Sequence, residues 1–161
     1  MLHKTRNFGL IFKNKVGIVS QVSKKVFECG GNIVASDMKK LGSHFAFDLT
    51  ATFPEVQPTS QIFSDLRTGP EVKTADDYYV QVMKVTAGDN PGIIHSTSAK
   101  LEALGADITR LASRITPAPF SSGPLFSLII EFRVDRKYSH EAIEKHMGPI
   151  IEEYGCDVQL K

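Results

Sequence analysis

The sequence predicts an α+β protein that contains two tandem βαββαβ units, with antiparallel sheets and helices on one face. Three observations favour this fold class. The chain matches itself when it is shifted by 75 positions, which indicates a repeated unit. In each copy, runs of strand period and helix period follow in the order strand, helix, strand, strand, helix, strand. The third strand of each copy alternates apolar and polar residues, as strands with one buried face do.

The repeat is clearest from residue 14 to residue 39, where the match to the second copy needs no gap. Identical residues recur there in both copies. The pairs are Gly17/Gly92, Ile18/Ile93, Ser23/Ser98, Lys25/Lys100, Gly30/Gly105 and Ile33/Ile108. We therefore predict one domain at residues 1–74 and a second domain at residues 75–161.

The first unit contains all the elements of this order. They are predicted as strands at residues 8–12, 33–38, 45–53 and 71–73 and as helices at residues 18–29 and 62–66. A glycine pair that starts at Gly30 ends the first helix, and Thr59 or Ser60 can cap the second helix. Phe45 and Phe47 alternate with small or polar residues, so they should lie in the core.

The second unit repeats the order. Its predicted strands are residues 78–85, 108–115, 126–134 and 158–160, and its predicted helices are residues 93–104 and 140–154. Ser139 can cap the last helix, and Gly148 with Pro149 should kink or split it. The linker at residues 74–77 is short. We therefore expect the units to pack against each other or against a second chain, with the second strands as the edges that meet.

A loop rich in proline and serine separates the second and third strands of the second unit, at residues 117–124. The first unit has a tight turn at the same place. The loop contains Phe120, whose side chain we expect to be exposed because it lies among prolines and serines. Such a loop can be a lid or a contact surface, and it can equally be a stiff extension of the hairpin.

The turn before the first helix of the second unit reads Asp89-Asn90-Pro91-Gly92-Ile93. Asp89 or Asn90 can cap the helix, Pro91 suits its first position, and Gly92 admits a close approach. The N–H groups and the positive end of the helix dipole can hold a carboxylate. A capped turn without a ligand explains the same residues. The candidate ligand-binding residues are Asp89, Asn90, Pro91, Gly92 and Ile93, with Asn14, Gly17 and Ile18 at the equivalent turn of the first unit.

Composition restricts the function further. A net charge of +1 gives no field that would favour nucleic acid or a membrane. No apolar run reaches the roughly 18–20 residues of a membrane span. Cys29 and Cys156 lack the spacing of a metal or redox motif, and the N-terminus has no secretory pattern. We therefore expect a cytoplasmic protein with free thiols and without a metal or a cofactor.

Two other functions fit part of the pattern. An RNA-recognition module shares the βαββαβ order, but it exposes the aromatic residues of its third strand. Here Phe45 and Phe47 share a face with other apolar residues. His95 near the helix start could be a general base, yet the sequence supplies no nucleophile and orienting group around it. His140 and His146 lack the spacing of a metal pair, so neither catalysis nor a metal site is predicted.

The second unit resembles ACT domains, a family of small-molecule regulatory modules, in its first turn and in residues 104–108. The segments Thr116-Pro117-Ala118-Pro119 and Ser122-Gly123-Pro124-Leu125-Phe126-Ser127 are similar to the tandem-ACT family called glycine cleavage system transcriptional repressors. The resemblance covers residues 8–160. The first repeat departs from it, because Asn14-Lys15-Val16-Gly17 keeps the glycine and lacks the proline and the acid.

The resemblance implies two ferredoxin-like ACT units in a non-catalytic regulatory protein that senses an amino acid, with glycine among the candidates. It would regulate transcription or metabolism through a protein partner, either a transcriptional regulator or an enzyme. A homodimer is expected, without direct contact to nucleic acid or a membrane. A regulatory subunit of an amino-acid metabolic enzyme is the alternative.

In ACT domains, the amino acid lies between the first turn of one unit and the second strand of a neighbouring unit. Backbone N–H groups of Gly92 and Ile93 could receive its carboxylate, and Asp89 or Asp107 could receive its ammonium. The first turn carries Lys15, which would repel an ammonium. We therefore predict a ligand at residues 89–93 rather than at residues 14–18.

Overall fold

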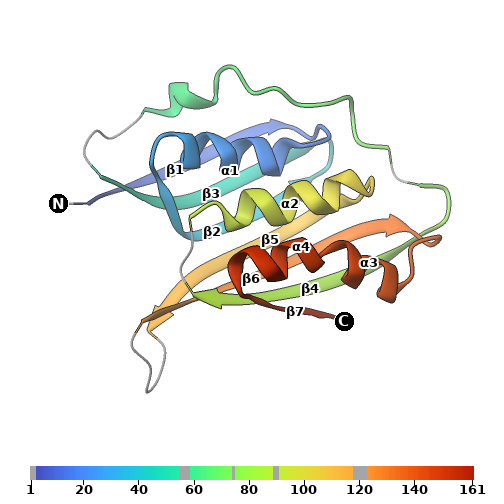
Figure 1. Cartoon of the computed structure of the whole chain (residues 1–161). Coiled ribbons are helices and arrows are strands. Elements are labelled where there is room, and N and C mark those ends of the chain that lie inside the picture. Colours follow the sequence, from blue (N-terminus) through green and yellow to red (C-terminus); the bar gives the residue numbers. More distant parts are fainter. Residues whose placement is uncertain (1–2, 55–58, 74, 89–90, 118–122) are drawn as a thin grey trace.

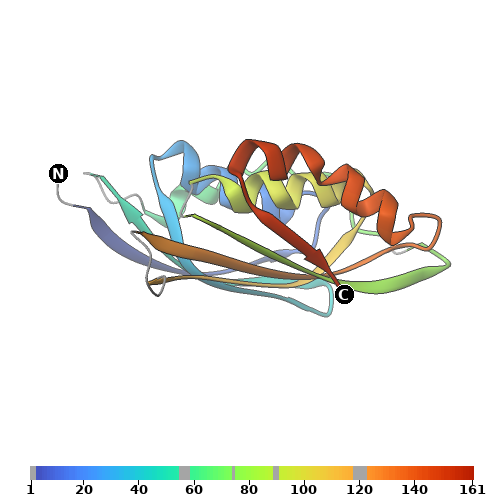
Figure 2. The same cartoon turned by 60° about the horizontal axis from the view of Figure 1, so that its bottom comes forward.

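The described part of the chain forms one antiparallel sheet of seven strands, and helices cover one face of this sheet (Figures 1 and 2). The structure is a computed structural model that describes residues 3–54, 59–73, 75–88, 91–117 and 123–161. The strands are β1 (Lys4–Lys13), β2 (Asn32–Leu41), β3 (His44–Phe53), β4 (Tyr78–Gly88), β5 (Asp107–Pro117), β6 (Pro124–Asp135) and β7 (Asp157–Leu160). The helices are α1 (Ile18–Glu28), α2 (Ile93–Ala103), α3 (His140–His146) and α4 (Gly148–Tyr154), with a short 3-10 helix η1 (Ser60–Phe63).

Two tandem ferredoxin-like units form this sheet, so the predicted α+β fold class is confirmed. Among the described residues, the second unit has the complete βαββαβ order, whereas the first unit has a short 3-10 turn in place of its second helix and no fourth strand. The strands lie in the order β1-β3-β2-β5-β6-β4-β7. In the second unit, β4 and β6 are central, with β5 and β7 outside them, which is the ferredoxin-like order. The first unit arranges β1, β3 and β2 in the same way beneath α1 (Figure 1).

The short helix predicted at residues 62–66 is shorter in the structure. It is the single turn η1, and the side chain of Phe63 at its end is buried in the core. Thr59 caps the turn, as the sequence predicts, because its hydroxyl accepts a hydrogen bond from the Gln61 N–H at 3.4 Å. The short turn therefore contributes one buried side chain, Phe63, to the core where the sequence predicts an amphipathic helix.

The prediction of a strand at residues 71–73 is wrong. Among the described residues, this segment makes only an isolated antiparallel bridge between Glu71 and Lys15. The chain returns beside the turn that follows β1, where the Val16 N–H donates to the Pro70 carbonyl at 2.9 Å. Proline has no N–H to donate, so Pro70 prevents the ladder from extending.

Strands β2 and β5 join the two units, and these are the strands that the sequence predicts to be edges. In the middle of their antiparallel pairing, Asp37 lies opposite Ala112. The two positions differ by the repeat offset of 75 residues, so the pair sits on a local twofold axis that relates the units. The same relation places α1 and α2 side by side above the β2–β5 pairing, which we call the seam (Figure 1).

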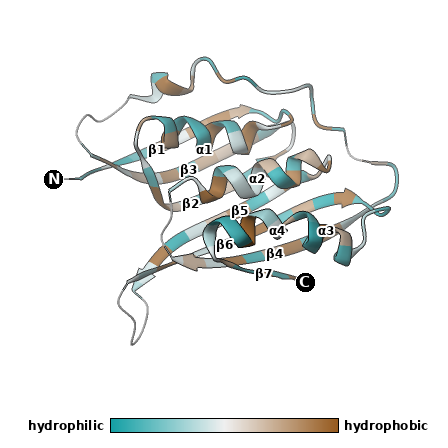
Figure 3. Cartoon of the chain, in the orientation of Figure 1, coloured by the Kyte–Doolittle hydropathy of each residue, from teal (hydrophilic) through white to brown (hydrophobic). Residues whose placement is uncertain are grey.

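The core lies between the helices and the covered face of the sheet, and Figure 3 shows the hydrophobic residues recurring along the strands. Six residues that the pattern places in the core are buried, each with at most 4% of its surface exposed, whereas Ile151, which the pattern of the last helix places inward, is 38% exposed. The six residues are Ile18, Phe45, Phe47, Ile93, Phe126 and Leu128. The third strand therefore offers no aromatic platform for nucleic-acid bases, which contradicts the RNA-recognition interpretation.

The last predicted helix is divided as the sequence indicates. Met147 separates α3 from α4, and Pro149 lies in the first turn of α4. The Ser139 hydroxyl caps α3 by accepting a hydrogen bond from the Ala142 N–H at 3.1 Å. No helix among the described residues is long and apolar enough to cross a membrane.

The proline-rich loop between β5 and β6 lies mostly outside the described residues, and this includes Phe120. Its two ends are described, and Pro117 pairs with Pro124 at the end of the β5–β6 ladder. The hairpin therefore continues to the point where the description stops.

The polar contact between Ser36 and Ser113 at the seam can be tested by mutation. The hydroxyl oxygens of Ser36 and Ser113 lie 2.5 Å apart and both residues are buried. Ser36→Ala and Ser113→Ala are each expected to lower the free energy of unfolding by about 1 kcal/mol, since each leaves a buried hydroxyl without its partner. The double variant should lose less than the sum, which urea denaturation measures. Strictly additive losses would contradict this contact.

Candidate functional site

Equivalent turns start α1 and α2. Gly17 and Gly92 are the N-cap residues, with φ angles of +85° and +87°, in the left-handed region that favours glycine. Ile18 and Ile93 follow them as the first helical residues, and both side chains are buried. Because both N-cap residues are glycines, neither helix is capped by a hydrogen bond to the side chain of its N-cap residue.

The expectation that Pro91 takes the first helical position is wrong. The helix begins at Ile93, and Gly92 stands between the two residues because the turn requires a left-handed conformation there. Asp89 and Asn90 lie outside the described residues. The described part of this candidate site is therefore Pro91, Gly92 and Ile93.

Each turn faces the end of the helix from the other unit. A Cβ atom on Gly92 would lie 3.3 Å from the ring of Phe27, and a Cβ atom on Gly17 would lie 3.3 Å from Oε2 of Glu102. Phe27 and Glu102 are equivalent positions at the offset of 75 residues. An aromatic ring therefore covers one turn, and a carboxylate covers the other.

The second turn has little room beside its described residues. The cavity there measures about 10 Å³ and its lining includes Phe27, Ile93, His95 and Phe126. The lining contains no lysine, arginine, aspartate or glutamate among the described residues. The prediction that a ligand binds at residues 89–93 stays a prediction, because Asp89 and Asn90 are not described.

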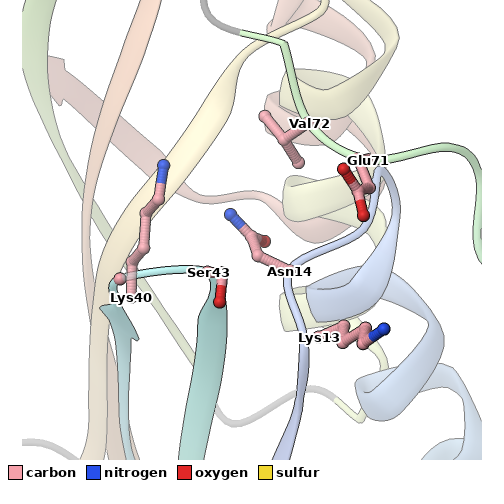
Figure 4. Close-up of a pocket in the computed structure, with 7 residues that line it drawn as sticks. Lys13, Asn14, Lys40, Ser43, Glu71 and Val72 are labelled. Atoms are coloured by element: carbon pink, nitrogen blue, oxygen red, sulfur yellow. The ribbon is translucent and has the colours of Figure 1, made fainter.

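A larger cavity of about 300 Å³ lies beside the first turn. It is lined by Lys13, Asn14, Lys40, Gly42, Ser43, Glu71 and Val72. Figure 4 shows Lys40 on β2, Asn14 directly after the end of β1, and the segment that carries Glu71 and Val72 around this cavity. The cavity therefore brings cationic, amide, hydroxyl and acidic groups together at the end of β1.

A buried ion group forms one wall of this region. Asp107, only 2% exposed, accepts a bond from Lys40 Nζ at 2.8 Å and one from Asn14 Nδ2 at 3.4 Å. The guanidinium of Arg133 lies 3.6 Å from the same carboxylate. The group links the first unit to the start of β5 across the seam. Asp107 is therefore occupied by protein cations, and it does not offer a free carboxylate to a ligand ammonium.

Glu102 from α2 occupies the N-terminus of α1. Its carboxylate accepts hydrogen bonds from the Ser20 N–H and the Ser20 hydroxyl, both at 3.2 Å. Burial raises the pKa of Glu102 to about 7, although the two bonds from Ser20 act in the opposite direction. The position that the helix dipole would offer to a ligand carboxylate is thus filled by a side chain of the other unit.

The described residues contain no arrangement that suggests catalysis. His95 lies between the helices, with Nδ1 3.0 Å from the Ser20 carbonyl, so it is a packing residue of the α1–α2 contact. His146 similarly lies 2.7 Å from the Lys100 carbonyl. No group of three or more metal-ligating side chains occurs in the described part of the chain.

Sequence reasoning missed Lys40, Glu71 and Glu102 as residues of this region. Glu102 could have been found from the repeat, since the offset of 75 residues and the twofold seam place the end of α2 against the first turn. Glu71 had no such signal, because its place depends on how the irregular segment after η1 returns to the sheet. Lys15, predicted to repel an ammonium, lies 3.7 Å from the Glu71 carboxylate, which partly neutralises it.

Comparisons with known proteins support the fold. No protein-family model and no curated protein matches the chain. An unknown protein from Galdieria sulphuraria matches with 23% identity over 98% of both chains and a TM-score of 0.50. Aspartate kinase from Synechocystis matches 96% of this chain and 28% of its own, with 12% identity and a TM-score of 0.60. The chain thus corresponds to a little over a quarter of that enzyme.

A protein described as a candidate glycine cleavage system transcriptional repressor also matches. It is 14% identical and covers all of this chain, and the chain covers 98% of it. Its TM-score of 0.42 is too low to carry an argument. The two stronger likenesses agree with the ferredoxin-like topology of the two units.

Proposed function

We propose that this chain is a non-catalytic regulatory protein of two ACT units that binds an amino acid beside the first turn of its first unit and passes the signal to a protein partner. The partner would be a transcriptional regulator or an enzyme. The resemblance to glycine cleavage system repressors, carried by the turn and loop segments of the sequence, makes glycine one candidate ligand. A homodimer in the cytoplasm is part of this proposal.

The observation that carries the proposal is the polar cavity of about 300 Å³ beside the first turn. This volume lies at the low end of the range of small-molecule sites, which suits a ligand as small as an amino acid. Lys40 uses one N–H on Asp107 and has two more to donate to a ligand carboxylate. Glu71, whose side chain is 78% exposed and whose contact with Lys15 is long at 3.7 Å, can attract an ammonium. A zwitterion requires both signs of charge within a few ångströms.

A screen of the twenty amino acids by thermal shift tests this function. A ligand that binds the folded protein raises its midpoint, by an amount that grows with concentration above the dissociation constant. Titration calorimetry then gives the affinity of the amino acid that responds. If none of the twenty shifts the midpoint at millimolar concentration, the sensing function is wrong.

Variants then locate the site. Glu71→Gln is expected to weaken binding by roughly tenfold or more, because a charge-assisted hydrogen bond contributes about 1.5–3 kcal/mol. The exposed Glu152→Gln on α4 is the matched control and should leave the affinity unchanged. If Gly92→Val abolishes binding while Glu71→Gln does not, the ligand lies at the second turn, as the sequence predicts.

A further inference from the structure

The face of the sheet turned away from the helices carries a concavity near the seam. In Figure 2 this face lies beneath the strands, with the helices above them. The concavity measures about 500 Å³ and is lined by Lys39, Lys40, Gly42, Thr109, Arg110, Glu131 and Arg133. It begins where the pairing of β2 with β5 ends, at Lys39 and Arg110. Four of its lining residues are cationic, against one acid.

Two of these cations are direct neighbours on adjacent strands. Lys39 and Arg110 lie directly opposite on β2 and β5, and both are exposed. Side chains in that relation start about 5 Å apart, and like charges there are unfavourable. Neither forms an ion pair with another described residue. Glu131, opposite Arg110 on β6, instead accepts a hydrogen bond from the Thr109 hydroxyl at 2.8 Å.

A third cation enters the concavity from β6. The side chain of Arg133 is 27% exposed, lies 3.6 Å from Asp107 and stands over the ring of Tyr78 at 5.5 Å. Its contact with Asp107 is longer than the 2.8 Å contact that Lys40 makes with the same carboxylate. Part of its guanidinium therefore stays open to the concavity.

We propose that this concavity binds the phosphate group of a small molecule. Lys39 supplies a point charge, and Arg110 and Arg133 supply the planar forks that match phosphate oxygens. An anion bound between Lys39 and Arg110 would relieve their repulsion. The volume suits a molecule of nucleotide size. The site adjoins the proposed amino-acid cavity and shares Lys40 and Gly42 with its lining. The three cations on which the proposal rests line only this concavity, and the site requires no amino acid to be bound.

Calorimetric titration of the whole protein at low ionic strength, with ATP in one series and inorganic phosphate in another, tests the proposal. Lys39→Gln and Arg110→Gln are each expected to weaken binding by about threefold to tenfold, as loss of one partly exposed charge contact would. Both variants should fold, because each removes one of two repelling charges. Arg114→Gln is the matched control, since Arg114 is an exposed arginine on the same strand, β5, and lies outside the lining of the concavity.

The two titrations also separate the possible sources of the phosphate. Tighter binding of ATP than of phosphate would assign the site to a larger phosphate-bearing molecule, and equal binding would assign it to free phosphate. No binding of either at millimolar concentration would overturn the proposal. Equal weakening by Arg114→Gln would overturn it as well, because attraction would then come from general surface charge. Each result can be read whether or not an amino acid binds elsewhere.

Discussion

Asp107→Ala is expected to lower the free energy of unfolding by about 3 kcal/mol. Removing one member of a buried ion group typically costs about 3–5 kcal/mol, because the remaining charges lose their counter-charge. Here the low end applies, since the side chains of Lys40 and Arg133 are 22% and 27% exposed and can regain water. Urea denaturation measures the loss at neutral pH.

Asp77→Ala is the matched control. Asp77 lies 2.9 Å from Arg136, which is close to the 2.8 Å between Asp107 and Lys40, but its side chain is 75% exposed. An exposed pair of this kind contributes about 0–1 kcal/mol. Similar small losses in both variants would show that the group around Asp107 does not hold the seam together.

The repeat explains why so much of the fold could be predicted. The offset of 75 residues identified two units, and the mixed patterns of the second strands identified the edges that meet at Asp37 and Ala112. The break at Pro149 was equally clear, because a proline inside a helix removes a hydrogen bond wherever it occurs. These features depend on local chemistry and on the period of apolar residues, which the sequence states directly.

The site was harder to predict, because its character comes from side chains of the other unit. The two turns are nearly identical in backbone, yet Phe27 covers one and Glu102 covers the other. Nothing within either turn indicates which side chain will face it. The segment around Glu71 was mispredicted as a strand for a related reason. Its position follows from where Pro70 meets the turn after β1, which no local period encodes.

Glu102→Gln is expected to stabilise the protein above pH 7 by up to about 3 kcal/mol. Burial raises the pKa of Glu102 from 4.5 to about 7, and each pKa unit corresponds to about 1.4 kcal/mol between the two protonation states. Between pH 4.5 and 7 the folded protein holds a proton that the unfolded chain releases. The contribution of Glu102 to stability is therefore full below pH 4.5 and is lost as the pH rises to 7. Glutamine keeps the shape of the side chain without the charge.

The measurement compares the free energy of unfolding of the two proteins from about pH 4 to pH 8. Other carboxylates change stability over the same range, so only the difference between wild type and Glu102→Gln reports on this residue. That difference should grow from about pH 4.5 and level off above pH 7. Glu152→Gln, at an exposed position of α4, should give a difference that does not vary with pH. A Glu102→Gln protein that loses stability at about pH 8 would instead mean that the ionised carboxylate stabilises the N-terminus of α1 through Ser20.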